Sequence, residues 1–324
     1  MRMIAIGSGG NKFIELLSAA HELRNLEPHH DWDVIAGISA GALVGALISM
    51  VPQNDLAAFN HEFERAKCKF IKDAEASPFR PHVPFGQFAN ALFAVLLNKE
   101  SLFSGMDDFV DNEFDANRYK RCGRRLLVGC FDNTHQKYLT VDSKCNSPTI
   151  MQSAILASAS VPVAMPAVNI NGVGRCRDGG LCHTIPVVEI KRFVEEAKSA
   201  GKRVHIDLLI SDQIENPPQQ RPDPINLTGS LLDTCTSLVW VNLQRDLVDL
   251  CHLLADTTAD QDRALHLIRS GEQRKFDRPW GSLRVIAPKD MGPRRRIRTY
   301  FRVPKKETAE ALIQKGAKAA RASM

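Results

Sequence analysis

The chain reads DVIAGISAGALVGALISM from Asp33 to Met50, and this segment contains the pattern most informative about the fold. Residues 33–36 predict a buried strand, because the run is short, mostly apolar and partly β-branched. Residues 37–41 predict a sharp turn, since they hold two glycines and a serine. The apolar residues that follow predict a helix over 42–50. The stretch therefore predicts a strand, a turn and a helix that pack in a core.

The residues before this stretch repeat the same order of elements. Residues 2–6 predict a first buried strand, and Gly7-Ser8-Gly9-Gly10 predicts a turn because glycine adopts positive φ freely. Apolar positions then recur at helical spacing from Lys12 to about Leu26. Strand, helix, strand and helix in the first 50 residues imply an α/β fold. We expect a parallel-rich central sheet that lies between helices, in a three-layer sandwich.

Later segments predict further elements by the same hydrophobic patterns. Strands are expected at 125–131, 137–141, 166–170, 204–210, 283–287 and 298–303. Helices are expected at 54–73, 85–97, 148–158, 187–200, 226–255, 259–275 and 306–320. The proline-rich residues 212–224 predict a loop. Because no strong boundary interrupts the chain, residues 1–324 are expected to form a single domain.

The composition excludes several classes of protein. With 324 residues, 44% of them hydrophobic and 24% charged, the chain is neither fibrous, nor disordered, nor a small disulfide scaffold. Its eight cysteines form no C-x-x-C pair, which predicts free thiols in a reducing compartment rather than a zinc ribbon. The apolar start of the chain is too short and too soon charged for a signal peptide, so a cytoplasmic location is expected. Residues 34–54 carry no charge, but their glycines and polar residues favour a buried core segment over a membrane span.

Positive charge is concentrated at the C-terminal end. Residues 289–324 contain 11 Lys or Arg and 3 Asp or Glu, a net charge of +8, whereas the whole chain carries +5, so the first 288 residues carry −3. We predict a basic C-terminal segment over 289–324. Its run Arg294-Arg295-Arg296 fits peripheral contact with anionic membranes, a solvated charge run without a partner, or nucleic acid. Nucleic acid is the least favoured of these, because no aromatic interleaving accompanies the arginines.

Residues 37–41 form a G-x-S-x-G motif between a predicted strand and a predicted helix. A serine at such a turn projects its oxygen clear of the sheet, and Gly37 and Gly41 keep side chains out of the way. The N-terminus of the helix adds partial positive charge near a developing anion. Ser39 is therefore a candidate nucleophile. Only one strand precedes the strand before Ser39, which is too early for the common α/β-hydrolase sheet, so a different hydrolase sheet is expected.

The turn at residues 7–10 is expected beside Ser39, because adjacent parallel strands end at the same edge of a sheet. Backbone N–H groups around Gly9 and Gly10 would then point to a position above Ser39, where they would form an oxyanion hole. The alternative is a phosphate-binding turn, although Lys12 stands where the G-x-G-x-x-G pattern requires glycine. Lys12 fits either use.

Asp178-Gly179-Gly180 provides a candidate base. An Asp before two glycines is ordinarily a turn residue. A nucleophilic serine needs a base, however, and a carboxylate held within hydrogen-bond reach can serve. The ten histidines of the chain are rivals for this role, with His183 nearest to Asp178 in the sequence and His29 and His30 before the second predicted strand.

Together these motifs resemble the patatin-like phospholipase family. The glycine-rich turn, the G-x-S-x-G near residue 40 and the later D-G-G stand in the family's order. Residues 157–166 (ASASVPVAMP) resemble its Ala- and Ser-rich, Pro-containing block, and residues 311–316 (ALIQKG) resemble the helix that often ends such domains. The resemblance spans nearly the whole chain. It implies a patatin-like sandwich and hydrolysis of fatty-acyl esters of phospholipids or related lipids, without a metal or another cofactor.

The resemblance also implies roles for single residues. Ser39 would be the nucleophile of a Ser–Asp dyad and Asp178 its base. The oxyanion hole would comprise the backbone around Gly9, Gly10 and Asn11, with Lys12 nearby. Two alternatives stay open: an acyltransferase that uses the same acyl-enzyme, and a non-catalytic lipid-binding protein of the same fold.

The chain departs from the family pattern at two places. Ser8 and Phe13 stand where the glycine-rich turn usually has glycine, and Thr184 precedes Pro186 where the family commonly offers Asn. These departures concern the donors of the oxyanion hole rather than the dyad.

Overall fold

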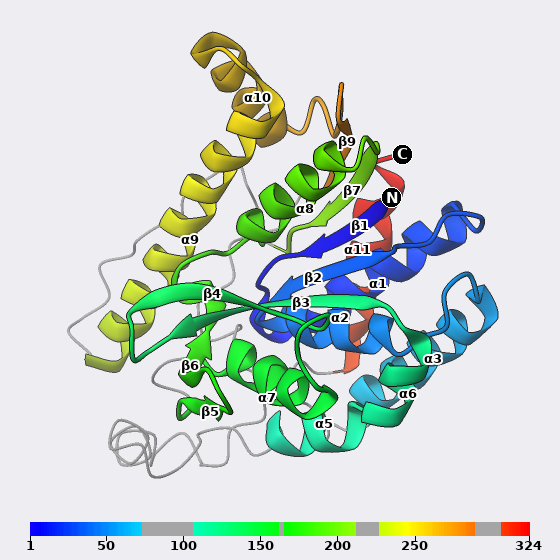
Figure 1. The fold of residues 1–324 in the computed structure, drawn as a ribbon, viewed down its shortest axis with the longest axis vertical. Helices are drawn as coiled ribbons and strands as arrows, with labels where there is room; N and C mark the ends of the chain where they lie inside the picture. The colour runs from blue at the N-terminus through cyan, green and yellow to red at the C-terminus, as the bar shows by residue number, and fades with distance from the viewer. Residues whose placement is uncertain (73–105, 162–164, 212–226, 289–305) are drawn as a thin grey trace.

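The computed structural model describes residues 1–72, 106–161, 165–211, 227–288 and 306–324 (Figure 1). A nine-stranded sheet in this part of the chain has the order β5-β6-β3-β2-β1-β7-β9-β8, and β4 pairs with β3 off this path. The strands are β1 Arg2–Ile6, β2 Val34–Ile38, β3 Arg125–Asp132, β4 Lys137–Asp142, β5 Val168–Ile170, β6 Gly174–Asp178, β7 Val204–Leu209, β8 Lys275–Arg278 and β9 Gly281–Ile286. The central strands β3, β2, β1, β7 and β9 are paired in parallel, whereas β4, β5, β6 and β8 join by antiparallel pairing. The parallel-rich sheet expected from the sequence is confirmed.

Helices cover both faces of this sheet, as Figure 1 shows. The α-helices are α1 Phe13–Leu26, α2 Ala40–Ser49, α3 Leu56–Lys72, α5 Met106–Glu113, α6 Ala116–Cys122, α7 Pro148–Ala159, α8 Val187–Ser199, α9 Leu227–Leu254, α10 Thr258–Ser270 and α11 Lys306–Arg321. One face packs against α1, α2, α3, α7 and α11, and the other against α8, α9 and α10. The molecule therefore has the three layers of an α/β sandwich.

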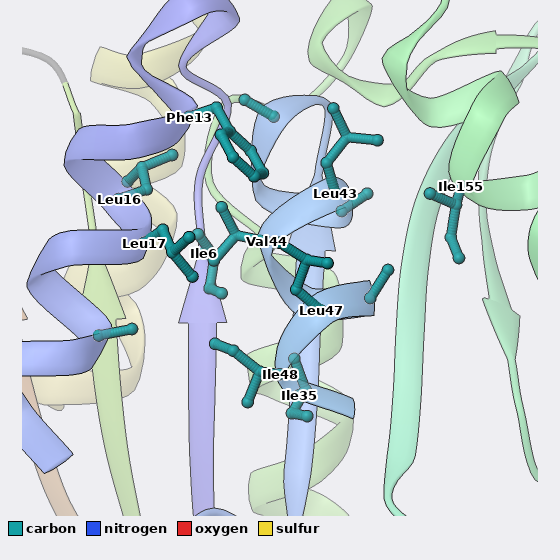
Figure 2. Close-up of a cluster of buried hydrophobic side chains, with 14 of the residues drawn as sticks. Ile6, Phe13, Leu16, Leu17, Ile35, Leu43, Val44, Leu47, Ile48 and Ile155 are labelled. Carbon is teal, nitrogen blue, oxygen red and sulfur yellow. The ribbon is translucent and has the colours of Figure 1, made fainter. Parts of the chain in front are cut away.

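The strands serve both cores because successive side chains point to opposite faces of a sheet. On β1, Ile4 and Ile6 enter the core with α1 and α2, whereas Met3 and Ala5 enter the core with α8 and α9. Figure 2 shows the first of these cores, where side chains of α1 and α2 meet Ile6. Strands that are buried on both faces read as continuous apolar runs, which is why β1 and β2 were recognisable in the sequence.

Some elements differ from the sequence-based expectation. The predicted helix at 259–275 was wrong at its end, because Gly271 adopts φ 67° and caps α10 after Ser270, and the residues that follow form β8 against β9. The short strand β6, which lies between β5 and β3, was not predicted, since its sequence GRCRD has no apolar run. The short helices α5 and α6 were not predicted either. The predictions at 85–97, 212–224 and 298–303 lie outside the described residues.

The C-terminal helix α11 packs directly against α1. A Cβ atom on Gly316 would lie 2.1 Å from the carbonyl oxygen of Glu15, so only glycine permits this approach. Lys315 pairs with Glu15 at 3.4 Å, and Arg321 with Glu22 at 2.6 Å. Part of the basic C-terminal segment thus pairs with carboxylates of the protein itself, while Arg294-Arg295-Arg296 lies outside the described residues.

Candidate active site

Ser39 occupies the tight turn between β2 and α2. Its backbone has φ 57° and ψ −125°, a conformation that costs a non-glycine residue free energy and persists only where the surroundings enforce it. Its N–H donates to Oγ of Ser158 at 2.9 Å, and that hydroxyl donates in turn to the carbonyl of Gly129 at 2.6 Å. Ser39 is only 4% exposed. The turn is therefore strained, buried and held by a hydrogen bond that it donates to Ser158 of α7.

The two glycines of the motif permit close approach of the backbone. A Cβ atom on Gly37 would lie 2.3 Å from the carbonyl oxygen of Gly41, and one on Gly41 would lie 2.2 Å from that of Ile6. Both distances are far below any tolerated contact. The glycines thus let α2 begin directly against β1 and β2, which fixes where Ser39 lies above the sheet edge.

Asp178 reaches Ser39 through the pairing of three strands. Ile38 pairs with Gly129 of β3, and Cys130 of the same strand pairs with Asp178 at the end of β6. The side chain of Ser39 interacts with the carboxylate of Asp178 and lowers its pKa. Two residues that are 139 positions apart in the sequence thus meet at one edge of the sheet.

Burial sets the proton affinity of this carboxyl group. Asp178 is 5% exposed, and loss of hydration raises its pKa from 3.8 to about 7. Hydrogen bonds from the N–H of Gly180, at 2.7 Å, and from Ser39 act in the opposite direction by stabilising the carboxylate. A pKa near neutrality suits a general base.

The two positions after Asp178 also require glycine for steric reasons. A Cβ atom on Gly179 would lie 2.4 Å from the carbonyl oxygen of Gly129, and one on Gly180 would lie 2.9 Å from Oδ1 of Asp178. The D-G-G sequence therefore lets the loop lie flat on β3 while a backbone N–H turns back to the carboxylate.

The glycine turn follows β1 at the same edge, because Ile6 pairs with Gly37 at the end of β2. The backbone N–H groups of Gly9 and Gly10 have no hydrogen-bond acceptor among the described residues. Gly10 has φ 53° and begins the 3₁₀ turn Gly10–Lys12, which continues through Asn11. The turn thus offers unpaired N–H donors beside Ser39, as an oxyanion hole requires.

Hydrogen bonds from neighbouring segments anchor the glycine turn. The N–H of Ser8 donates to the carbonyl of Thr184 at 2.8 Å, and Oγ of Ser211 donates to the carbonyl of Ser8 at 2.9 Å. Nζ of Lys12 donates to the carbonyl of Ser211 at 3.0 Å, which ties the end of the turn to the segment after β7. Phe13 is buried at the start of α1. The unusual residues Ser8 and Phe13 are thus accommodated, one by its backbone bonds and one in the core.

Comparison with known proteins identifies the family. The model of the patatin-like phospholipase family matches residues 4–190, more than half of the chain. The chain belongs to the patatin-like phospholipase family. A search of the curated proteins finds no match. Among solved structures, VipD from Legionella pneumophila is similar at 10% identity with a TM-score of 0.33, over 97% of this chain and 66% of that one. The chain thus spans slightly less than two thirds of the VipD chain.

The rival histidines of this patatin-like protein lie elsewhere. Nδ1 of His183 is 2.7 Å from Oδ1 of Asp246, and among the described contacts it reaches neither Ser39 nor Asp178. His29 and His30 are exposed before the amino end of β2, whereas Ser39 follows its carboxyl end. Within the described ranges, no group of three or more His, Cys, Asp or Glu side chains could hold a metal ion.

Several supporting residues of the patatin-like site were not identified from the sequence. Ser158 and Ser160 belong to the Ala- and Ser-rich block: Ser158 holds the N–H of Ser39, and the carbonyl of Ser160 accepts the N–H of Asp178 at 3.1 Å. The alternating small residues of this block were the sequence signal from which Ser158 and Ser160 could have been identified as supporting residues. Ser211 had no such signal, because the chain brings it to the glycine turn from a distant strand.

Proposed function

We propose that this protein is a serine acyl hydrolase, which cleaves fatty-acyl esters of phospholipids or related lipids through Ser39 and Asp178. Family membership supports lipid acyl hydrolysis as the general class of activity. The observation that carries the finer proposal is the contact between Ser39, on a strained turn, and the buried carboxylate of Asp178. Phospholipase A activity is the proposed reaction class.

The proposed reaction has two halves. Asp178 accepts the proton of Ser39 while Oγ attacks the ester carbonyl carbon, and the oxyanion receives hydrogen bonds from the backbone around Gly9, Gly10 and Asn11. The intermediate collapses, the alcohol leaves with the proton from Asp178, and the fatty acyl group stays on Ser39. Water then attacks the acyl-enzyme with Asp178 again as base, which releases the fatty acid and restores the hydroxyl. The ammonium of Lys12 adds positive charge near the hole.

The proposal extends to where the substrate is met. We place the enzyme in the cytoplasm, with peripheral contact to anionic membranes through Arg294, Arg295 and Arg296 rather than with nucleic acid. The net charge of +8 in residues 289–324 supports this part of the proposal. Within the described residues, no helix is long and apolar enough to cross a bilayer.

Replacement of the nucleophile tests the proposal. Ser39→Ala is expected to fold, to retain less than a few per cent of wild-type hydrolysis of phospholipids and p-nitrophenyl esters, and to escape labelling by a fluorophosphonate probe. Ser153→Ala is the matched control, because Ser153 lies on α7 and only donates to the carbonyl of Thr149. Full labelling of Ser39→Ala would show that another residue is the nucleophile. Labelled wild-type enzyme that transfers acyl groups only to an alcohol would indicate an acyltransferase, and wild type that neither labels nor hydrolyses would indicate a lipid-binding protein.

A further inference from the structure

Helix α9 contacts the loop after Asp178 with three polar side chains within about one helical turn. The side-chain amide of Asn242 donates to the carbonyls of Gly180 and Leu181, at 3.2 and 2.9 Å. The guanidinium of Arg245 donates to the carbonyl of Cys182. Positions i, i+3 and i+4 of a helix share one face, so Asn242, Arg245 and Asp246 all contact this loop. The described part of α9 thus binds the backbone of residues 180–185 almost residue by residue.

Asp246 makes the largest number of these contacts. One carboxylate oxygen accepts the N–H groups of Thr184, at 2.6 Å, and Ile185, at 3.0 Å, while the other lies 2.7 Å from Nδ1 of His183. The side chain of Asp246 is 0% exposed. A carboxylate is stable in such a place only when its hydrogen bonds are satisfied, so its removal would leave buried donors unpaired.

Thr184 lies in the loop after Asp178 and connects Asp246 to the glycine turn. Its carbonyl accepts the N–H of Ser8, and a Cβ atom on Gly7 would lie 2.9 Å from the same oxygen. Its hydroxyl donates to the carbonyl of Val239 on α9 at 3.1 Å. Thr184 is therefore held by α9 on one side and holds the glycine turn on the other. Thr184, which stands where the family commonly has Asn, thus connects the glycine turn to the loop after Asp178.

We infer that Asp246 is a positioning residue, which fixes the glycine turn and the Asp178 loop relative to each other through Thr184. The inference rests on the proposed hydrolysis by Ser39. The carboxylate of Asp246 touches neither Ser39 nor the position of the ester in the proposed reaction. Asp246 instead determines how the N–H groups of Gly9 and Gly10 and the carboxylate of Asp178 are placed relative to Ser39. The reacting groups come from separate segments, so a displacement of about 1 Å between them can lower kcat about a hundredfold.

The test uses the full-length protein with three variants at two positions of α9. Asp246→Ala removes every acceptor. Asp246→Asn retains an oxygen for the N–H groups of Thr184 and Ile185, and its amide can donate to the other tautomer of His183. Asp249→Ala is the matched control, because Asp249 lies on the same helix and only forms an ion pair with Lys191, at 3.6 Å.

The variants are compared by steady-state hydrolysis of p-nitrophenyl butyrate, by fluorophosphonate labelling and by amide hydrogen exchange. Asp246→Ala is expected to lower kcat about 10- to 100-fold per folded molecule, with KM changed less than about threefold. Asp246→Asn is expected to stay within about fivefold of wild type, and Asp249→Ala within about twofold. In Asp246→Ala the amide of Ser8 is expected to exchange at least about tenfold faster, because its acceptor is no longer fixed.

Two results would overturn the inference. One is folded Asp246→Ala with the kcat of Asp249→Ala, and the other is a loss of activity that merely follows the unfolded fraction. If Asp246→Ala does not fold, Asp246→Glu replaces it, since this variant keeps the charge and displaces it by one methylene. A kcat for Asp246→Glu equal to wild type would then reject the inference, and a tenfold fall would support it. If wild type hydrolyses no ester, the proposed function fails, while the exchange rate of Ser8 still decides whether Asp246 anchors the turn.

Discussion

Replacement of Asp178 by Asn should make the protein more stable and far less active. The folded protein raises the pKa of this carboxyl group from 3.8 to about 7, chiefly by burial. Between these two values the native state keeps a proton that the unfolded chain has lost, so the free energy of unfolding falls as the pH rises through this window. The shift of about 3 pKa units corresponds to a loss of about 4 kcal/mol, which is complete above about pH 7. Asn carries no titrating proton and escapes this loss.

The geometry lets Asn replace the protonated form of Asp178 without rearrangement. Its Oδ1 can still accept the N–H of Gly180, and its amide can donate to Oγ of Ser39. We therefore expect Asp178→Asn to match wild type near pH 4 and to exceed its free energy of unfolding by up to about 4 kcal/mol at pH 8. The same change should lower kcat by about 10²–10⁴, because the base of the proposed reaction is lost.

Urea denaturation from pH 4 to pH 8 measures the first effect, and hydrolysis of a small soluble ester measures the second. Asp249→Asn serves as the control, because this carboxylate lies at the surface beside Lys191. A stability difference between Asp178→Asn and wild type that does not change with pH would refute the assignment of a raised pKa. Activity of Asp178→Asn above a few per cent of wild type would refute its role as base. In wild type, kcat/KM should rise with pH to a plateau above about 7, since the base must be deprotonated.

Three further perturbations address other parts of the protein. Replacement of Arg294, Arg295 and Arg296 by Gln should weaken cosedimentation with anionic vesicles, most at low salt, and leave hydrolysis of a soluble ester intact; equal binding across salt concentrations would contradict membrane contact. Ser158→Ala should lower the free energy of unfolding by about 1–3 kcal/mol and lower kcat, measured by urea denaturation and ester hydrolysis, because the N–H of Ser39 and the carbonyl of Gly129 lose their partner. Gly41→Ala should lower the melting temperature more than Gly45→Ala, because the added Cβ meets the backbone of β1 at 2.2 Å in the first variant but only side-chain atoms, at 3.0 Å or more, in the second; equal melting temperatures would contradict this.

Local sequence alone determined much of the fold. The mostly apolar runs at 2–6 and 33–36 predicted strands that are buried on both faces, and the glycines between strand and helix predicted the sharp turns, although the second strand extends to Ile38. These signals are local, because each depends on the periodicity or backbone freedom of a few neighbouring residues. The motif around Ser39 is local only in part, because Gly37 is required by the start of α2 directly after its own strand, whereas Gly41 is required by the close approach of β1.

The surroundings of the site depend on tertiary packing. The raised pKa of Asp178 depends on burial of its carboxyl group in the folded protein, and no residue next to Asp178 in the sequence predicts it. Ser158, Ser211 and Asp246 support the site from α7, from the end of β7 and from α9, across sequence separations that carry no pattern. Their positions follow from strand order and helix packing, which are properties of the whole chain. The motifs thus predicted which residues meet, and the packing of distant segments determined how those residues are held.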